Sequence, residues 1–125
     1  GPLDMRKLGI LYIDYGDPAK ALPVFRQMLN ATDDIRIKQD AYSRIMTVYA
    51  RLSKEEEMKK TLKELQTLDP FSSTSQGGEI KLYTYLSENG KKGDAYKILK
   101  NFTSKYPYSE YLPFVKKQLQ NIESE

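Results

Sequence analysis

The chain has 125 residues, of which 39% are hydrophobic and 30% are charged, and its net charge is +3. This length is enough for one domain with a continuous core. The charge is too small to indicate nucleic acid or an anionic membrane as a partner, and no apolar run approaches the ~18 residues of a membrane-spanning helix. We therefore expect neither nucleic-acid binding nor direct membrane insertion.

Residues 1–2, Gly-Pro, resemble the remnant left when a protease removes a purification tag. We interpret residues 3–125 as the folded domain and expect it to be a piece of a larger protein. The sequence contains no cysteine, which is compatible with both reducing and oxidising compartments.

The first part of the chain, residues 3–33, predicts a pair of helices joined by a tight turn. Leu8, Leu11, Tyr12 and Tyr15 recur at spacings of three and four residues, which is typical of one helical face. Gly16 ends this helix, and Pro18 occupies the first position of the next, where its missing N–H costs nothing. Pro23 lies inside the second helix, so we expect a bend there.

Residues 34–70 predict a second hairpin, again with apolar residues at helical spacing. Ser53 followed by Glu56 has the pattern of a capping box, which places the start of the second helix of this hairpin at Ser53. Residues 70–78 are rich in serine and glycine, so we expect a loop that is either flexible or faces a ligand.

A third hairpin is predicted over residues 76–107, with its first helix beginning near Gly78. Residues 109–123 then predict a last helix, with Ser109 as its N-cap and an apolar stripe on one side only. A helix with a polar outer face suits the end of an array of helical hairpins. We expect this helix to cap the structure.

The first hairpin resembles a tetratricopeptide repeat, whose signature reads W-x2-L-G-x2-Y, then A-x3-F, then P. Met5 stands where the family has tryptophan, and Asp33 stands where it has proline. Small residues in the two helices let them cross closely. The signature positions that match outright are Leu8, Gly9, Tyr12, Ala21 and Phe25.

Many of the signature positions align again when the chain is shifted by 37 residues, although Met5 corresponds to Tyr42 and then to Glu79, which departs from the pattern. Pro70 and Pro107 occupy the position of the proline that closes the family's repeat. Gly9 corresponds to Met46 and Tyr83, which are bulkier, so the later helix pairs cannot cross as closely at that point. The resemblance implies an all-α fold, an α-solenoid of three tetratricopeptide-like hairpins followed by a C-terminal capping helix.

A short run, F-x3-YP-x-S-x-Y at residues 102–111, is similar to one that links repeats in bacterial cell-envelope tetratricopeptide proteins. This resemblance implies a location in the bacterial periplasm or cell envelope. The cytoplasm is the alternative.

Composition excludes several catalytic chemistries. The chain has no histidine and no cysteine, which excludes Ser–His and Cys–His nucleophilic pairs and the usual zinc sites. We expect no enzymatic activity, no metal and no cofactor. The family resemblance instead implies a protein–protein interaction module, a scaffold that binds a protein or peptide partner.

We predict that the partner lies along the first helix of each hairpin, because in the family these helices line the concave surface. Lys7, Arg44 and Lys81 recur at intervals of 37 residues and would form a ladder of positive charge. Such a ladder suits an acidic or carboxylate-bearing peptide. The plainer interpretation is that these side chains only solvate an exposed face. The predicted neighbours in this surface are Ile10, Ile13, Thr47, Arg51 and Thr84.

Three alternatives follow from the same residues. Family members that grip chaperone tails use asparagine where this chain has Ile10 and Thr47, which argues against that ligand. Leu3, Ile10 and Leu11 form an apolar edge on the first hairpin, which would allow homo-oligomerisation or packing against a preceding segment. RNA binding by a helical repeat is a remote alternative, since the net charge is small and no base-reading residues recur.

Overall fold

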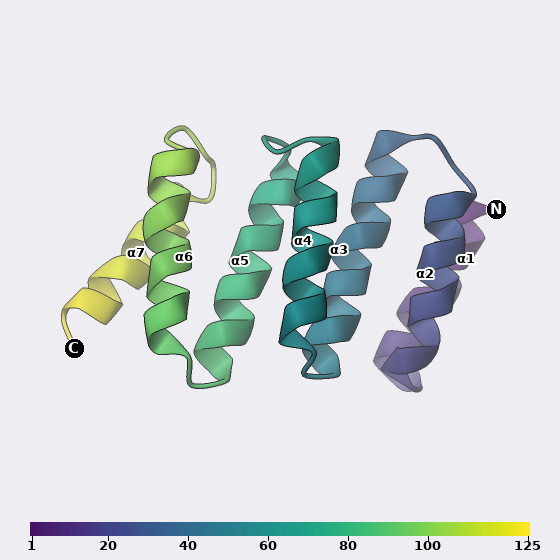
Figure 1. Ribbon diagram of the computed structural model, residues 1–125, viewed down its shortest axis with the longest axis horizontal. Coiled ribbons are helices and arrows are strands. Elements are labelled where there is room, and N and C mark those ends of the chain that lie inside the picture. The colour runs from purple at the N-terminus through teal and green to yellow at the C-terminus, as the bar shows by residue number, and fades with distance from the viewer. The chain divides into compact units, whose positions relative to one another are not determined.

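The computed structural model describes all of residues 1–125 and is entirely helical, with seven α-helices, one short 3₁₀ helix and no strand (Figure 1). This confirms the all-α fold class. The chain divides into two compact units, Gly1–Pro70 and Phe71–Glu125, and each has its own core. The assembly of the hairpins into a solenoid stays a prediction.

The first unit consists of two helical hairpins joined by short turns (Figure 1). Consecutive helices pack on one another, α1 on α2, α2 on α3 and α3 on α4, and α1 also contacts α3. The elements of this unit are α1 (Pro2–Tyr15), the 3₁₀ helix η1 (Pro18–Lys20), α2 (Ala21–Asn30), α3 (Ile35–Arg51) and α4 (Glu55–Leu68).

Close packing between α1 and α2 is centred on Gly9 and Phe25. The Phe25 ring is fully buried, and a Cβ atom added to Gly9 would lie 2.5 Å from Phe25 Cζ. Ala21, one turn before Phe25 on α2, is also fully buried. The signature residues of the first hairpin therefore make the close crossing that their sizes predict.

The apolar face predicted for the first helix does not lie in the core. Leu8, Leu11 and Tyr15 are 45%, 54% and 86% exposed, respectively. The residues of α1 that are buried are Gly9 and Ile13. The helix packs on α2 through the side opposite to its largest apolar side chains, because only glycine leaves room for the Phe25 ring.

The prediction that Pro23 lies inside the second helix is wrong, because Pro23 lies in the first turn of α2. The chain first makes the short 3₁₀ turn η1, which Asp17 caps by accepting a hydrogen bond from the Ala19 N–H at 3.0 Å. The α-helix then starts at Ala21, so Pro23 falls in the first turn, where backbone N–H groups need no partner within the helix.

The capping role predicted for Ser53 is wrong. Ser53 has a φ of +56°, in the left-handed region, and it lies in the turn after α3 ends at Arg51. Its side chain does not cap α4, whose N-cap residue is Lys54. The serine occupies the position after a helix where the left-handed conformation is common and glycine is preferred. The three glutamates that follow do lie in the first turn of α4.

The second unit contains α5 (Ser73–Glu88), α6 (Lys92–Lys105) and α7 (Leu112–Glu123). The loop predicted over residues 70–78 is wrong, because α5 begins within it. Ser72 caps this helix by accepting a hydrogen bond from the Ser75 N–H at 3.0 Å. Ser75 is fully buried and Gly78 is buried as well, so these small residues serve close packing rather than a flexible loop.

The last helix, α7, contacts α6, and its Val115 and Leu119 are buried while Lys116 and Lys117 are exposed. This confirms its one-sided apolar stripe. Ser109 is not the N-cap residue, since the helix begins after Tyr111. Ser109 instead accepts a hydrogen bond from the Tyr111 N–H at 3.0 Å within the connecting turn.

Candidate functional site

The three basic residues of the predicted ladder lie on the first helix of each hairpin. Lys7 is on α1, Arg44 is on α3 and Lys81 is on α5. Lys7 is exposed, whereas Arg44 and Lys81 are half-buried. Lys7 and Arg44 belong to the first unit and Lys81 to the second, so a ladder made by all three stays a prediction.

Within the first unit, Asp40 joins two arginines on neighbouring helices. Its Oδ2 lies 2.7 Å from Arg6 Nε of α1, and its Oδ1 lies 3.6 Å from Arg44 Nε. Asp40 is not among the residues predicted for the site, although its spacing of four residues from Arg44 on one helix is a signal for an ion pair. Asp40 balances part of the positive charge of Arg6 and Arg44.

The neighbouring candidates differ in how much surface they present. Ile13 is only 7% exposed, so it offers little area to a partner. Ile10 and Thr47 are half-buried, and the Thr47 hydroxyl donates a hydrogen bond to the Ser43 carbonyl at 3.3 Å. Arg51 and Thr84 are exposed. The accessible part of the predicted surface in the first unit is therefore more polar than the sequence suggests.

A polar pocket of about 280 Å³ lies among α2, α3 and α4 in the first unit. Burial, followed by the nearby charge of Glu64, raises the pKa of the Tyr42 hydroxyl above 10.0, and Arg26 opposes this rise. Arg26 also donates a hydrogen bond to the Tyr49 hydroxyl at 2.7 Å. The pocket contains none of the predicted site residues. Its lining is Arg26, Leu29, Asn30, Lys38, Tyr42 and Glu64.

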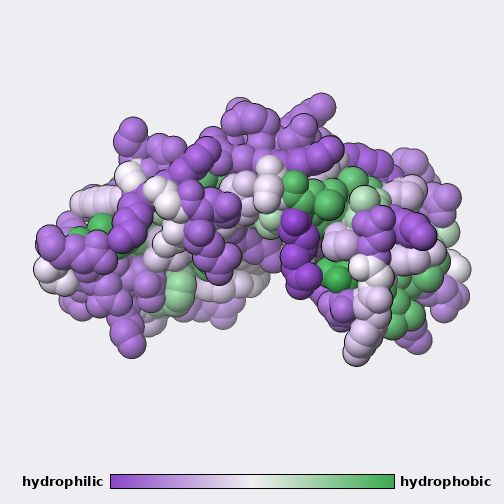
Figure 2. Space-filling model, turned by 90° about the horizontal axis from the view of Figure 1, so that it is seen from below, coloured by the Kyte–Doolittle hydropathy of each residue, from purple (hydrophilic) through white to green (hydrophobic).

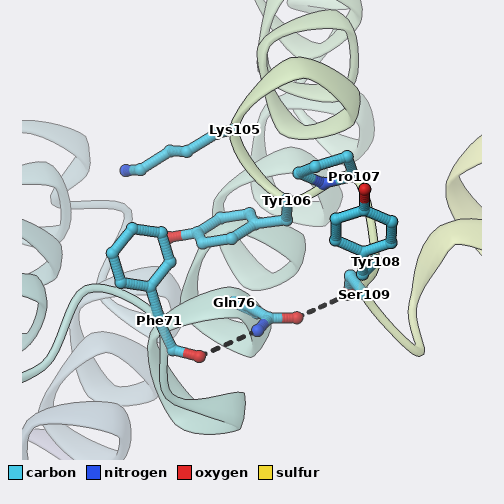
Figure 3. Close-up of a pocket in the computed structure, with 7 residues that line it drawn as sticks. All are labelled: Phe71, Gln76, Lys105, Tyr106, Pro107, Tyr108 and Ser109. Carbon is cyan, nitrogen blue, oxygen red and sulfur yellow. Dashed lines mark hydrogen bonds between the residues drawn. The ribbon is translucent and has the colours of Figure 1, made fainter.

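A second pocket, of about 340 Å³, lies in the second unit between the start of α5 and the turn from α6 to α7 (Figure 3). Phe71 meets the Tyr106 ring edge-on, with centroids 6.2 Å apart, and Lys105 Nζ lies 5.3 Å from the centroid of Tyr106. Phe71 and Tyr108 are 68% and 98% exposed. Such a pocket can take an apolar or aromatic side chain, with a cation beside it.

Hydrogen bonds tie the turn that lines this pocket to α5 (Figure 3). Ser109 Oγ donates to Gln76 Oε1, and Gln76 Nε2 donates to the Phe71 carbonyl at 3.0 Å. Outside the pocket, Ser73 Oγ donates to Glu110 Oε1 at 3.0 Å. These contacts hold the aromatic rings in place without a ligand.

The run F-x3-YP-x-S-x-Y has a structural explanation in these contacts. Phe102 and Tyr106 are 1% and 3% exposed, with ring centroids 4.9 Å apart. The Tyr111 ring meets Phe102 edge-on at 6.4 Å, and its hydroxyl lies over Gly77, 3.1 Å from where a Cβ atom would be. Pro107 disfavours helix at the residue before it, and α6 ends at Lys105. The run therefore turns the chain from α6 to α7 and anchors it on α5.

No group of acidic residues is placed to hold a metal ion. None of the seven helices combines the length and the hydrophobicity that a membrane crossing requires. No protein-family model matches this sequence, and no curated protein matches it either. The likeness to tetratricopeptide repeats rests on the residues of the hairpins themselves.

Proposed function

We propose that this chain is a protein-interaction module whose helical hairpins hold a peptide or protein partner that carries acidic groups. The observation that carries the proposal is the packing of Phe25 against Gly9 and beside Ala21, three residues of the tetratricopeptide signature. Proteins of that family use such hairpins to present a binding surface on their first helices. The proposed binding residues here lie on α1 and α3 in the first unit and on α5 in the second.

The chemistry of this surface supports an acidic partner. Lys7, Arg44 and Arg51 bring cations to α1 and α3, and Lys81 brings one to α5. Hydrogen bonds between cationic side chains and carboxylates are about twice as strong as those between neutral groups. Asp40 lowers the net charge of the surface, and it lies closer to Arg6, at 2.7 Å, than to Arg44, at 3.6 Å.

We further propose that the module is part of a larger protein of the bacterial periplasm or cell envelope. The similarity of the run at residues 102–111 to envelope proteins supports this location. The same run has a structural role in the second unit. Its support for this location is the resemblance to envelope proteins.

Selection from a displayed library of random peptides tests the proposal. Aspartate and glutamate should be enriched in the selected peptides. The triple variant Lys7→Glu, Arg44→Glu and Lys81→Glu should bind these peptides at least about tenfold more weakly, since one lost ion pair can contribute up to about 1 kcal/mol at an exposed site.

A matched control separates a specific surface from a general effect of charge. Lys20, Lys60 and Lys97 are exposed and lie outside the first helices, and changing all three to glutamate alters the net charge equally. This control should bind the selected peptides almost as the wild type does. Equal losses in both triple variants, or selected peptides without acidic residues, would contradict the proposal. Peptides with aromatic residues that bind both variants would indicate the pocket at Phe71 and Tyr106 instead.

A further inference from the structure

The outward face of α1 is apolar although no element of the first unit covers it. Leu8, Leu11 and Tyr15 are 45%, 54% and 86% exposed and recur at spacings of three and four residues. This spacing is that of the seam between two paired helices. We call these three residues the α1 seam.

The opposite side of the same helix is already packed, because Gly9 and Ile13 are buried against the rest of the first unit. A helix that is apolar on both sides is normally covered on both sides. Figure 2 shows hydrophobic residues at the surface over the α1–α2 hairpin, at the right of the view. The α1 seam therefore has the character of a contact surface.

The residues that flank the α1 seam are arranged for pairing with a copy of the same helix. Lys7 and Asp14, both exposed, lie seven residues apart along one edge. Met5 and Tyr12, both half-buried, lie seven residues apart along the other edge. A two-fold axis perpendicular to the helices makes them antiparallel and pairs residue i with j and j with i.

In that antiparallel pairing, the edge of α1 with Lys7 and Asp14 faces the same edge of the second copy, and the edge with Met5 and Tyr12 does the same. When Leu8 lies opposite Leu11 of the second copy, Lys7 lies beside Asp14 of that copy, and Met5 lies beside its Tyr12. Each of these contacts forms twice. A parallel pairing would instead place identical residues at the same level, with Asp4 opposite Asp4, and would bring Lys7 and Asp14 together nowhere.

We propose that the chain forms a two-fold symmetric homodimer through the α1 seam, with antiparallel α1 helices and reciprocal Lys7–Asp14 ion pairs. The occupant is a second copy because the charges along this helix are complementary to themselves when the helix is reversed. This inference does not rest on the proposed peptide surface, although Lys7 belongs to both. Self-association is therefore tested in the absence of peptide.

Sedimentation equilibrium tests the dimer at protein concentrations up to about 1 mM, where even a weak interface associates. Wild-type protein should sediment as a monomer–dimer equilibrium. Leu11→Glu places two charges in the centre of the seam and should weaken the dimer about 100-fold or more. Ile35→Glu is the matched control, since Ile35 is also an exposed apolar residue, 52% exposed, but lies on α3, and it should leave the dimer unchanged.

Charge exchange tests the orientation of the helices. Lys7→Asp and Asp14→Lys should each weaken the dimer about tenfold, because each puts two like-charged pairs at the edge. The double variant, Lys7→Asp with Asp14→Lys, should restore the wild-type association. Circular dichroism should show unchanged helicity for all variants, since the changed residues are solvent-exposed.

Three results would overturn the proposal. A wild-type protein that stays monomeric at the highest concentration has no such dimer. A Leu11→Glu variant that associates as tightly as the wild type does not use the α1 seam. A double charge variant that is no tighter than either single variant excludes the antiparallel pairing.

Discussion

Replacing Gly9 with alanine should destabilise the first unit, although alanine is the better helix former. The added Cβ would lie 2.5, 2.7 and 2.8 Å from three atoms of the Phe25 ring, which is fully buried. Overpacking of this kind costs up to about 3 kcal/mol. Alanine in place of glycine within a helix returns about 1 kcal/mol. The net loss should be as much as about 2 kcal/mol.

Urea unfolding followed by circular dichroism measures this loss. In thermal unfolding, a loss of about 2 kcal/mol would lower the melting temperature of a unit of this size by about 10 °C. Gly93→Ala on α6 is the matched control, because nothing lies within 4 Å of its added Cβ, and it should stabilise by about 0.5 kcal/mol.

A double variant shows whether the Phe25 ring is the cause. Phe25→Leu should relieve the collision with the alanine, so Gly9→Ala with Phe25→Leu should lose less stability than the two single changes added together. A Gly9→Ala variant that gains stability, as Gly93→Ala should, would refute the close crossing of α1 and α2.

Three further predictions concern the turns and a tyrosine. Ser53→Gly should stabilise the chain by up to about 1 kcal/mol in thermal unfolding, because a left-handed φ of +56° favours glycine; a loss of stability would contradict this conformation. Ser72→Ala should cost about 1 kcal/mol in the same assay, because the cap on the Ser75 N–H is lost, and an unchanged stability would show that α5 does not depend on that cap. Burial, and after it the charge of Glu64, raises the pKa of Tyr42 above its usual value of 10.0. The contribution of Tyr42 to the free energy of unfolding should therefore be fully present below pH about 10 and should be lost as the pH rises through the pKa in the folded state. Glu64→Gln should lower the pKa of Tyr42 in an NMR titration of the tyrosine rings, and a pKa that rises or stays fixed would be inconsistent with this cause.

Much of the secondary structure could be predicted from the sequence because its signals are local. Periodic apolar residues mark most of the helices, and Gly16 and Pro18 mark the first turn. Gly9, Ala21 and Phe25 even indicate how the first two helices cross, since a glycine on one helix and an aromatic ring on the other are complementary in size. These features depend on spacing and volume, which the sequence contains directly.

The errors in the fold arise where tertiary packing decides. Residues 72–78 have the composition of a loop, but Ser75 and Gly78 are buried and their small size lets α5 pack closely. Composition cannot distinguish a small residue used for flexibility from one used for close approach. Ser53 carries a similar ambiguity, because serine is common in turns of several kinds.

The candidate site was predicted less completely than the fold. The basic residues lie on the expected helices, yet the ion pair of Asp40 with Arg6 joins positions 34 residues apart, which no local pattern reveals. The sequence also does not predict which side of α1 faces the core, because the helix has apolar residues on two sides. The structure buries the side with Gly9, which lies against the Phe25 ring, and with Ile13, and it leaves Leu11 exposed.

The most direct test of the central claim is an NMR titration of the isotope-labelled chain with an acidic peptide obtained by selection. The proposed function predicts that the amide shifts that change will cluster around Lys7 on α1, Arg44 on α3 and Lys81 on α5. Residues of α2, α4 and α6 should change little. Changes confined to those second helices, or to the pocket at Phe71 and Tyr106, would contradict a partner held along the first helices of the hairpins.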